Sequence, residues 1–148
     1  MKKYIHYIAE TDFSRGHASV NRILNNARAI VATGKYDVGL IGYGCVPYQE
    51  FHEFPLHNVP YGTTSLGKAW HYARRGREVR KLLEKLPQKA DMIVYYGSSR
   101  RYLSQLRKYA DKHCIPLVAD VVEWYDPAAL RFGRFGPVAR DTHICLLY

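Results

Sequence analysis

Length, composition and charge place the chain among ordinary globular domains. Its 148 residues, 47% hydrophobic and 24% charged, fit one domain with a real core, because about 70% of the unfolded surface is buried at this size. No apolar run approaches the ~20 residues that a membrane-spanning helix needs. The formal net charge of +9 predicts an anionic partner: nucleic acid, an anionic membrane surface or a phosphorylated small molecule.

The amino-terminal segment and the cysteines predict a cytoplasmic protein with free thiols. The first thirteen residues contain two lysines but turn polar too early for a secretory signal. The three cysteines are odd in number and widely spaced. They have neither the CxxC spacing of a zinc site nor the even count of a disulfide framework, so we expect no metal centre.

Strands and helices alternate along the chain. Apolar and β-branched runs predict strands at Tyr4–Glu10, Tyr36–Gly44, Ala90–Gly97 and Ile115–Tyr125. Helical spacing predicts helices at Ala18–Gly34, Ser65–Leu86 and Ser98–Cys114. The segment Cys45–Gly62, with three prolines, is expected to be a long irregular loop with room for one edge strand.

This order indicates a doubly wound α/β domain with a mostly parallel, Rossmann-like sheet. The strands are continuous apolar runs, as in sheets that are covered on both faces. Such sheets bind ligands beyond the carboxyl ends of their strands. The loops expected there are Thr11–His17, Gly42–Val46, Gly97–Arg100 and Glu123–Asp126.

The first of these loops is a candidate anion site. Arg15 would supply charge, Gly16 would let a ligand approach the backbone, and His17 could transfer protons at the start of the next helix. The alternative is structural: Ser14 or Ser19 caps the helix, Gly16 makes the turn, and the other side chains are solvated. The loop matches neither GxGxxG nor a Walker loop, so neither dinucleotide nor P-loop phosphate binding is predicted.

A second candidate anion site is "YYGSSRR", where a glycine and two serines precede a helix that begins with arginines. Ser98 stands at a helix start and Arg100 follows it, as an anion site would require. The alternative is a simple capped helix whose arginines face solvent, and it is slightly favoured.

The stretch "VADVVEWYDP" ends the last predicted strand with a cluster of acidic and aromatic residues. Glu123 and Asp126 flank Trp124 and Tyr125. Carboxylates beside aromatic rings are typical of a sugar-binding surface, because rings stack on pyranose faces while carboxylates accept hydrogen bonds from the sugar hydroxyls. The alternative is that Trp124 covers the sheet edge and Asp126 makes a turn.

The helix at Ser65–Leu86 carries seven basic residues and two acidic ones. Such a helix can lie on an anionic membrane. The favoured interpretation is that it packs one face on the sheet and shows its basic residues to water. No recognised nucleic-acid motif accompanies the charge, so nucleic acid is not predicted as a partner.

Three segments together resemble a known family. "SRGHASVNRILNNARAIVATG", "VGLIGYG" and "PLVADVVEWYDP" are similar to the amino-terminal half of a family 4 glycosyltransferase of the GT-B fold. The similarity runs roughly from Lys2 to Pro137, and its most specific part is Asp120–Tyr125. The resemblance implies an acceptor-side domain of a hexosyltransferase in polysaccharide biosynthesis.

Further expectations depend on that resemblance. It implies a nucleotide sugar as co-substrate without a metal, a glycan or lipid-linked acceptor, and peripheral contact with the inner face of the membrane. It also implies that His17 and Glu123 serve as acid/base or acceptor-orienting residues, and that Arg15 and Gly16 approach the donor phosphates. The carboxyl-terminal GT-B domain is absent, so the chain is expected to be a truncated domain that is inactive alone. The alternative is a stand-alone, flavodoxin-like nucleotide- or ligand-binding module without catalysis.

Overall fold

The computed structural model describes residues 2–60 and 64–120. Within these ranges the elements follow the order β1 (Lys3–Asp12), the single-turn 3-10 helix η1 (Phe13–Arg15), α1 (Ala18–Ala32), β2 (Tyr36–Tyr43), β3 (Tyr48–Phe51), β4 (Phe54–Val59), α2 (Ser65–Lys85), β5 (Met92–Tyr96), α3 (Arg100–His113) and β6 (Leu117–Ala119).

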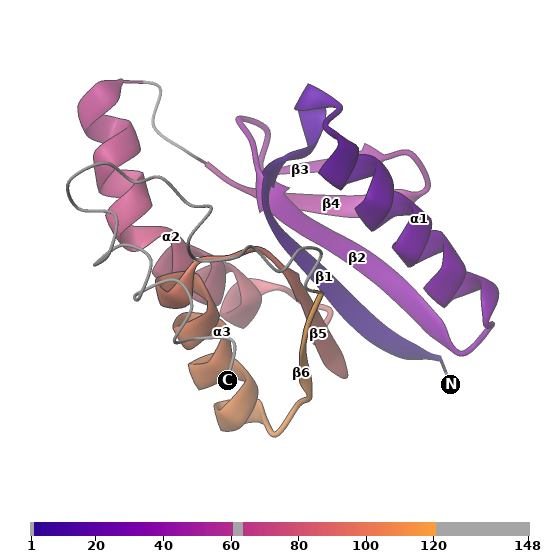
Figure 1. Cartoon of the computed structure of the whole chain (residues 1–148). Helices are drawn as coiled ribbons and strands as arrows, with labels where there is room; N and C mark the ends of the chain where they lie inside the picture. Colours follow the sequence, from indigo (N-terminus) through magenta and orange to yellow (C-terminus); the bar gives the residue numbers. More distant parts are fainter. Residues whose placement is uncertain (1, 61–63, 121–148) are drawn as a thin grey trace, which may run out of the picture.

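The strands form one sheet in the order β3-β4-β2-β1-β5-β6. All described pairings are parallel except that of β3 with β4. Helix α1 covers one face, and α2 and α3 cover the other (Figure 1). The prediction of a doubly wound, mostly parallel, Rossmann-like α/β fold is confirmed.

The two faces of the sheet have separate cores because side chains alternate along each strand. On the α1 face, Tyr7 and Leu40 pack with Ile23. On the opposite face, Ile8 packs with Val79 of α2 and with α3. The described residues include no helix that is both long enough and apolar enough to cross a bilayer.

The strand order reverses beside β1. From β1 the chain crosses through α1 to β2, on one side, and later crosses through α2 from β4 to β5, on the other side of β1. The loops after β1 and β5 therefore leave neighbouring strand ends toward opposite faces. This is the topological switch point at which open α/β sheets bind ligands.

The segment Cys45–Gly62 was expected to be an irregular loop with room for one edge strand. The edge strand is present as β3, but the irregular loop is wrong, because the segment also forms β4 between β3 and β2. Pro55 lies in β4 before the stretch that pairs with β2, which begins at Leu56. The buried Asn58 fixes the connection: its backbone N–H donates to the carbonyl of Pro47 and its Nδ2 to that of Val46, both at 2.8 Å. These partners are eleven and twelve residues away, so the local sequence did not reveal them.

His6 is a buried titratable group at the centre of the sheet. It is 1% exposed, and its Nε2 lies 3.1 Å from the carbonyl oxygen of Gln88. Because that partner only accepts, Nε2 carries the proton of the neutral ring. Burial lowers the pKa of His6 from 6.5 to about 4, although the bond to Gln88 opposes the shift.

We predict that His6 makes the fold less stable in acid. The folded pKa lies below the unfolded one, so the unfolded chain takes up the proton first, and stability falls as the pH drops from about 6.5 toward 4. The full loss is about 3 kcal/mol. The variant H6Q keeps a donor for Gln88 but does not titrate, so its free energy of unfolding should vary less with pH. Urea unfolding across this range measures it.

The control is H17Q, which removes an exposed histidine and should retain the pH dependence of the wild type. Equal pH dependence in H6Q and wild type would contradict the role given to His6.

Candidate functional site

The candidate site lies at the carboxyl ends of β1, β5 and β6, where the strand order reverses. Two loops define it: the segment from η1 to His17 after β1, and Gly97–Ser99 after β5. One polar network holds the second loop on β1, and another joins the end of β6 to β1 and α1.

The first network fastens the β5–α3 loop to β1. The Tyr95 hydroxyl donates to Glu10 Oε1, and the backbone N–H of Ser99 donates to the same oxygen at 3.0 Å. Burial, followed by the nearby charge and hydrogen bond of Glu10, raises the pKa of Tyr95 above its ordinary value. Tyr95 therefore stays a protonated donor, and Ser99 is held where its side chain accepts from Tyr102 N as the N-cap of α3.

Gly97 is required by this network. A Cβ at position 97 would lie 2.6 Å from Glu10 Oε1 and 2.7 Å from the Tyr95 hydroxyl oxygen. Both atoms belong to groups that are held by hydrogen bonds, so neither can move aside without loss of the network.

The second network gathers around Asp120, which follows β6. The carboxylate accepts from the Tyr7 hydroxyl, from Arg22 Nη2 at 2.8 Å and from Asn26 Nδ2 at 3.2 Å. Burial opposes its ionisation, but the hydrogen bonds from Arg22, Tyr7 and Asn26 outweigh burial and lower the pKa of Asp120. The backbone N–H of Asp120 also donates to the Tyr95 carbonyl at 2.8 Å. One carboxylate thus joins β6, β1 and α1.

The loop after β1 is shaped by Asp12. Its carboxylate accepts from Ser14 N at 3.0 Å and from Arg15 Nε at 3.2 Å. Gly16 has a φ of 62°, in the left-handed region that favours glycine. His17 is the N-cap of α1 and makes no side-chain cap hydrogen bond.

The alternative interpretation of this loop, in which a serine caps α1 and Gly16 makes the turn, is confirmed for the turn and wrong for the cap. Neither serine caps α1: Ser14 Oγ donates to Asp12 at 2.6 Å, and the N-cap is His17. Arg15 is bound to Asp12 rather than merely solvated.

The structure describes five of the nine site residues that the sequence predicted, and these five form two groups. Arg15, Gly16 and His17 stand together before α1, and Ser98 and Arg100 are exposed at the start of α3. The neighbouring ends of β1 and β5 carry these two groups. The remaining candidates, Glu123, Trp124, Tyr125 and Asp126, lie outside the described residues.

The residues that position the site were mostly missed. Glu10, Tyr95 and Asp120 have partners 85 to 113 residues away, which single-chain spacing does not reveal. A signal was present, however: Glu10 ends an apolar run and Asp120 interrupts one. An acid that is partly withdrawn from water needs a donor, so such residues mark polar networks. Among the described residues, no three His, Cys, Asp or Glu side chains are arranged to hold a metal ion.

Comparison with known proteins supports the fold. No protein-family model and no curated protein matches the sequence. Among solved structures, the C-terminal domain of a hydrogenase from Pyrococcus furiosus is similar, with a TM-score of 0.54 and 19% identity. The match covers 82% of this chain and 93% of that domain. At this identity the likeness concerns the fold alone.

The predicted membership of a family 4 glycosyltransferase is wrong. No family model supports it, and the matching solved structure is a domain of a hydrogenase rather than of a glycosyltransferase. Within the described residues, the segments behind the resemblance are a glycine turn before α1, the apolar strand β2, and β6 with Asp120 directly after it. A doubly wound fold uses such elements in its own right.

We predict that Gly97→Ala destabilises the protein by about 1–3 kcal/mol, because the added methyl group overlaps Glu10 and Tyr95. Urea unfolding measures the change. The neighbouring Ser98→Ala, at an exposed position, is the matched control and should stay within about 0.5 kcal/mol of wild type. A Gly97→Ala protein as stable as this control would show that the network is not tightly packed.

Proposed function

We propose that this domain binds a small anionic ligand of the nucleotide type at the carboxyl ends of β1 and β5, as a binding module without catalysis of its own. The observation that carries the proposal is the reversal of strand order between these two strands. At such a point the flanking loops separate toward opposite faces and leave a place for a ligand.

The chemistry of the two loops favours an anion. α1 and α3 both begin at this edge, and helix N-termini direct unpaired backbone N–H groups and partial positive charge toward it. Gly16 has no side chain to block the backbone, and Arg100 adds an exposed guanidinium at the start of α3. Guanidinium groups bind phosphate through paired hydrogen bonds.

The acidic residues of the same edge serve to position the loops. Glu10 is engaged by Tyr95 and the Ser99 backbone, and Asp120 by Tyr7 and Arg22. The hydrogen-bonding capacity of both carboxylates is therefore used by protein donors, and the charge of Asp120 is paired with that of Arg22. This arrangement supports a preorganised site, because the loops are held in place before a ligand arrives.

The test is isothermal titration calorimetry of the 148-residue protein with adenosine diphosphate, and separately with adenosine. We expect the diphosphate to bind and adenosine to bind more weakly. Arg100→Ala should weaken diphosphate binding about tenfold, since a hydrogen bond to a charged group contributes about 1.5–3 kcal/mol. Lys35→Ala, at an exposed loop before β2, is the control and should leave affinity unchanged.

Two results would contradict the proposal. One is the absence of binding heat with the diphosphate. The other is equal loss of affinity in Arg100→Ala and Lys35→Ala, which would mean that the ligand responds to net charge and not to this site.

A further inference from the structure

The positive charge of the protein is concentrated on one layer. Helices α2 and α3 carry twelve basic and three acidic residues, a net charge of +9, which is the net charge of the whole chain. The rest of the sequence is therefore neutral overall. Because both helices cover the same face of the sheet (Figure 1), the molecule has one strongly basic side, which attracts anionic surfaces.

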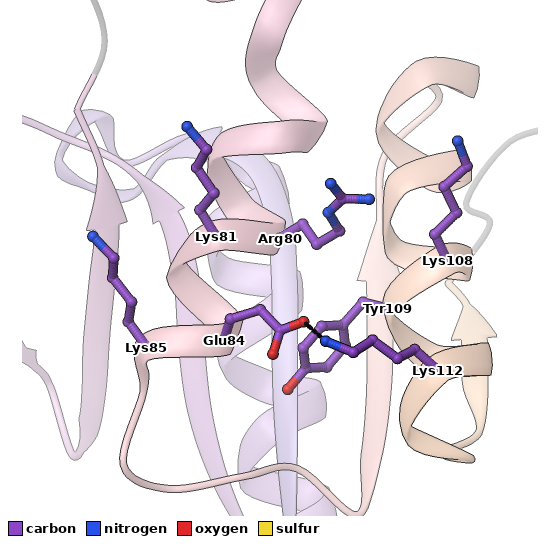
Figure 2. A pocket seen from close by; sticks show the side chains of 7 residues that line it. All are labelled: Arg80, Lys81, Glu84, Lys85, Lys108, Tyr109 and Lys112. Carbon is purple, nitrogen blue, oxygen red and sulfur yellow. Dashed lines mark hydrogen bonds and ion pairs between the residues drawn. The ribbon is translucent and has the colours of Figure 1, made fainter.

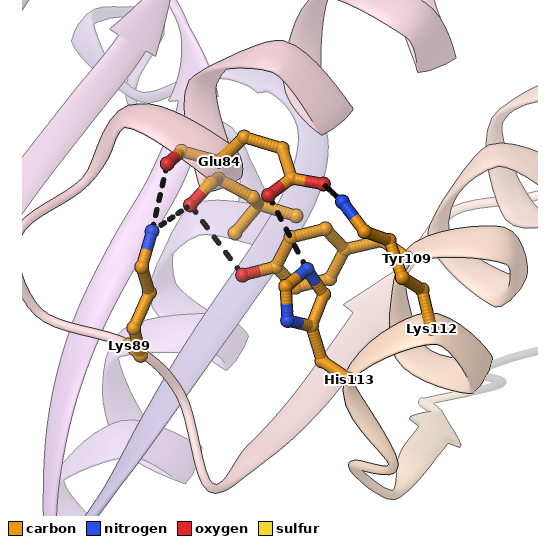
Figure 3. A network of polar contacts seen from close by, with 6 residues as sticks. Glu84, Lys89, Tyr109, Lys112 and His113 are labelled. Atoms are coloured by element: carbon orange, nitrogen blue, oxygen red, sulfur yellow. Dashed lines mark hydrogen bonds and ion pairs between the residues drawn. The ribbon is translucent and has the colours of Figure 1, made fainter.

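A groove of about 440 Å³ lies between these helices. Five basic side chains surround it: Arg80, Lys81, Lys85, Lys108 and Lys112 (Figure 2). The one acid in its lining is Glu84. Glu84 is held by Lys112 at 2.7 Å and by His113 at 3.3 Å (Figure 3). The excess of positive charge therefore remains available on the groove rim.

Contacts at the end of α2 and between α2 and α3 shape the groove. Lys89 Nζ donates to the last carbonyls of α2, those of Leu83 at 3.2 Å and Glu84 at 2.7 Å (Figure 3). The helices also pack closely at Gly76, where a Cβ would lie 2.9 Å from the Arg101 carbonyl oxygen. The basic side chains thus project from two closely packed helices.

Helix α2 also exposes large apolar side chains. Leu66 is 86% exposed and Trp70, one turn later, is 65% exposed. The Arg74 guanidinium lies over the Trp70 ring, 4.9 Å from its centroid. Arg77 and Lys81 continue the same side of the helix at spacings of three and four residues. The apolar side of α2 further along the helix packs on the sheet, through Val79 and Leu83. Its exposed part therefore offers apolar side chains at one end and cations beyond them, and both kinds of group contribute to binding at an anionic membrane interface.

We propose that the α2–α3 face docks on an anionic phospholipid surface. Leu66 and Trp70 enter the headgroup region, and the cations of the groove bind lipid phosphates. The exposed leucine favours a bilayer over a nucleic acid, since an aliphatic side chain gains from hydrocarbon but offers a phosphate backbone neither charge nor a hydrogen bond. The charge density fits an anionic surface, to which each lysine or arginine near the surface adds attraction.

The test is co-sedimentation with phosphatidylcholine vesicles that contain or lack phosphatidylglycerol. The wild type should bind only the anionic vesicles. The double variant Lys81→Glu/Lys85→Glu should lower the partition coefficient about tenfold or more. Lys3→Glu/Lys35→Glu makes the same change in net charge away from this face, at exposed positions, and should bind like the wild type. Equal loss in both double variants would overturn the proposal, because binding would then follow net charge alone.

Insertion is tested separately through Trp70. The chain has two tryptophans, so Trp124→Phe leaves Trp70 as the single reporter. Brominated lipids should quench its fluorescence in anionic vesicles, and Leu66→Ser should reduce both the quenching and the partition coefficient. Absence of quenching in anionic vesicles would contradict the insertion of this helix into the bilayer. Tighter binding to single-stranded RNA than to vesicles, with no effect of Leu66→Ser, would assign the face to nucleic acid instead.

Discussion

Two partly buried tyrosine–carboxylate hydrogen bonds hold the carboxyl edge of the sheet, and the candidate site depends on them. Glu10 with Tyr95 lies toward α2 and α3, and Asp120 with Tyr7 lies toward α1. The central strand β1 supplies one partner to each, an acid on one face and a phenol on the other. Because a carboxylate that loses solvent without gaining donors is costly, each pair favours one arrangement of the elements that meet at this edge.

Sequence patterns correctly predicted the features that depend on neighbouring residues, such as helix α1 and the turn at its end. The helical spacing of Val20, Ile23, Leu24 and Ala27 identified α1, and Gly34 beyond its end has the left-handed φ expected of it. Partners distant in the sequence were not predictable. Asp120 was visible as an acid in an apolar strand, but its bonds to Tyr7, Arg22 and Asn26 depend on three elements brought together by the sheet. The same limit explains the missed β3–β4 pair.

The two proposals use different parts of one charge distribution. The ligand site combines helix N-termini with carboxylates that protein donors already satisfy, so it suits a small anion held at a defined position. The α2–α3 face has excess lysine and arginine around an open groove, which suits an extended anionic surface. Helix α2 begins after β4, at the same edge as the ligand site. Leu66 and Trp70 therefore lie at that end of the molecule.

Amide NMR spectra during titration with adenosine diphosphate distinguish a ligand site at the switch point from the basic groove, which is a competing site for any anion. We expect chemical shifts to change first at Gly16, His17 and Arg100, beside the ends of β1 and β5, and not at Lys81 or Lys108. Shifts that begin in the α2–α3 groove and spare the two loops would contradict a ligand site at the switch point.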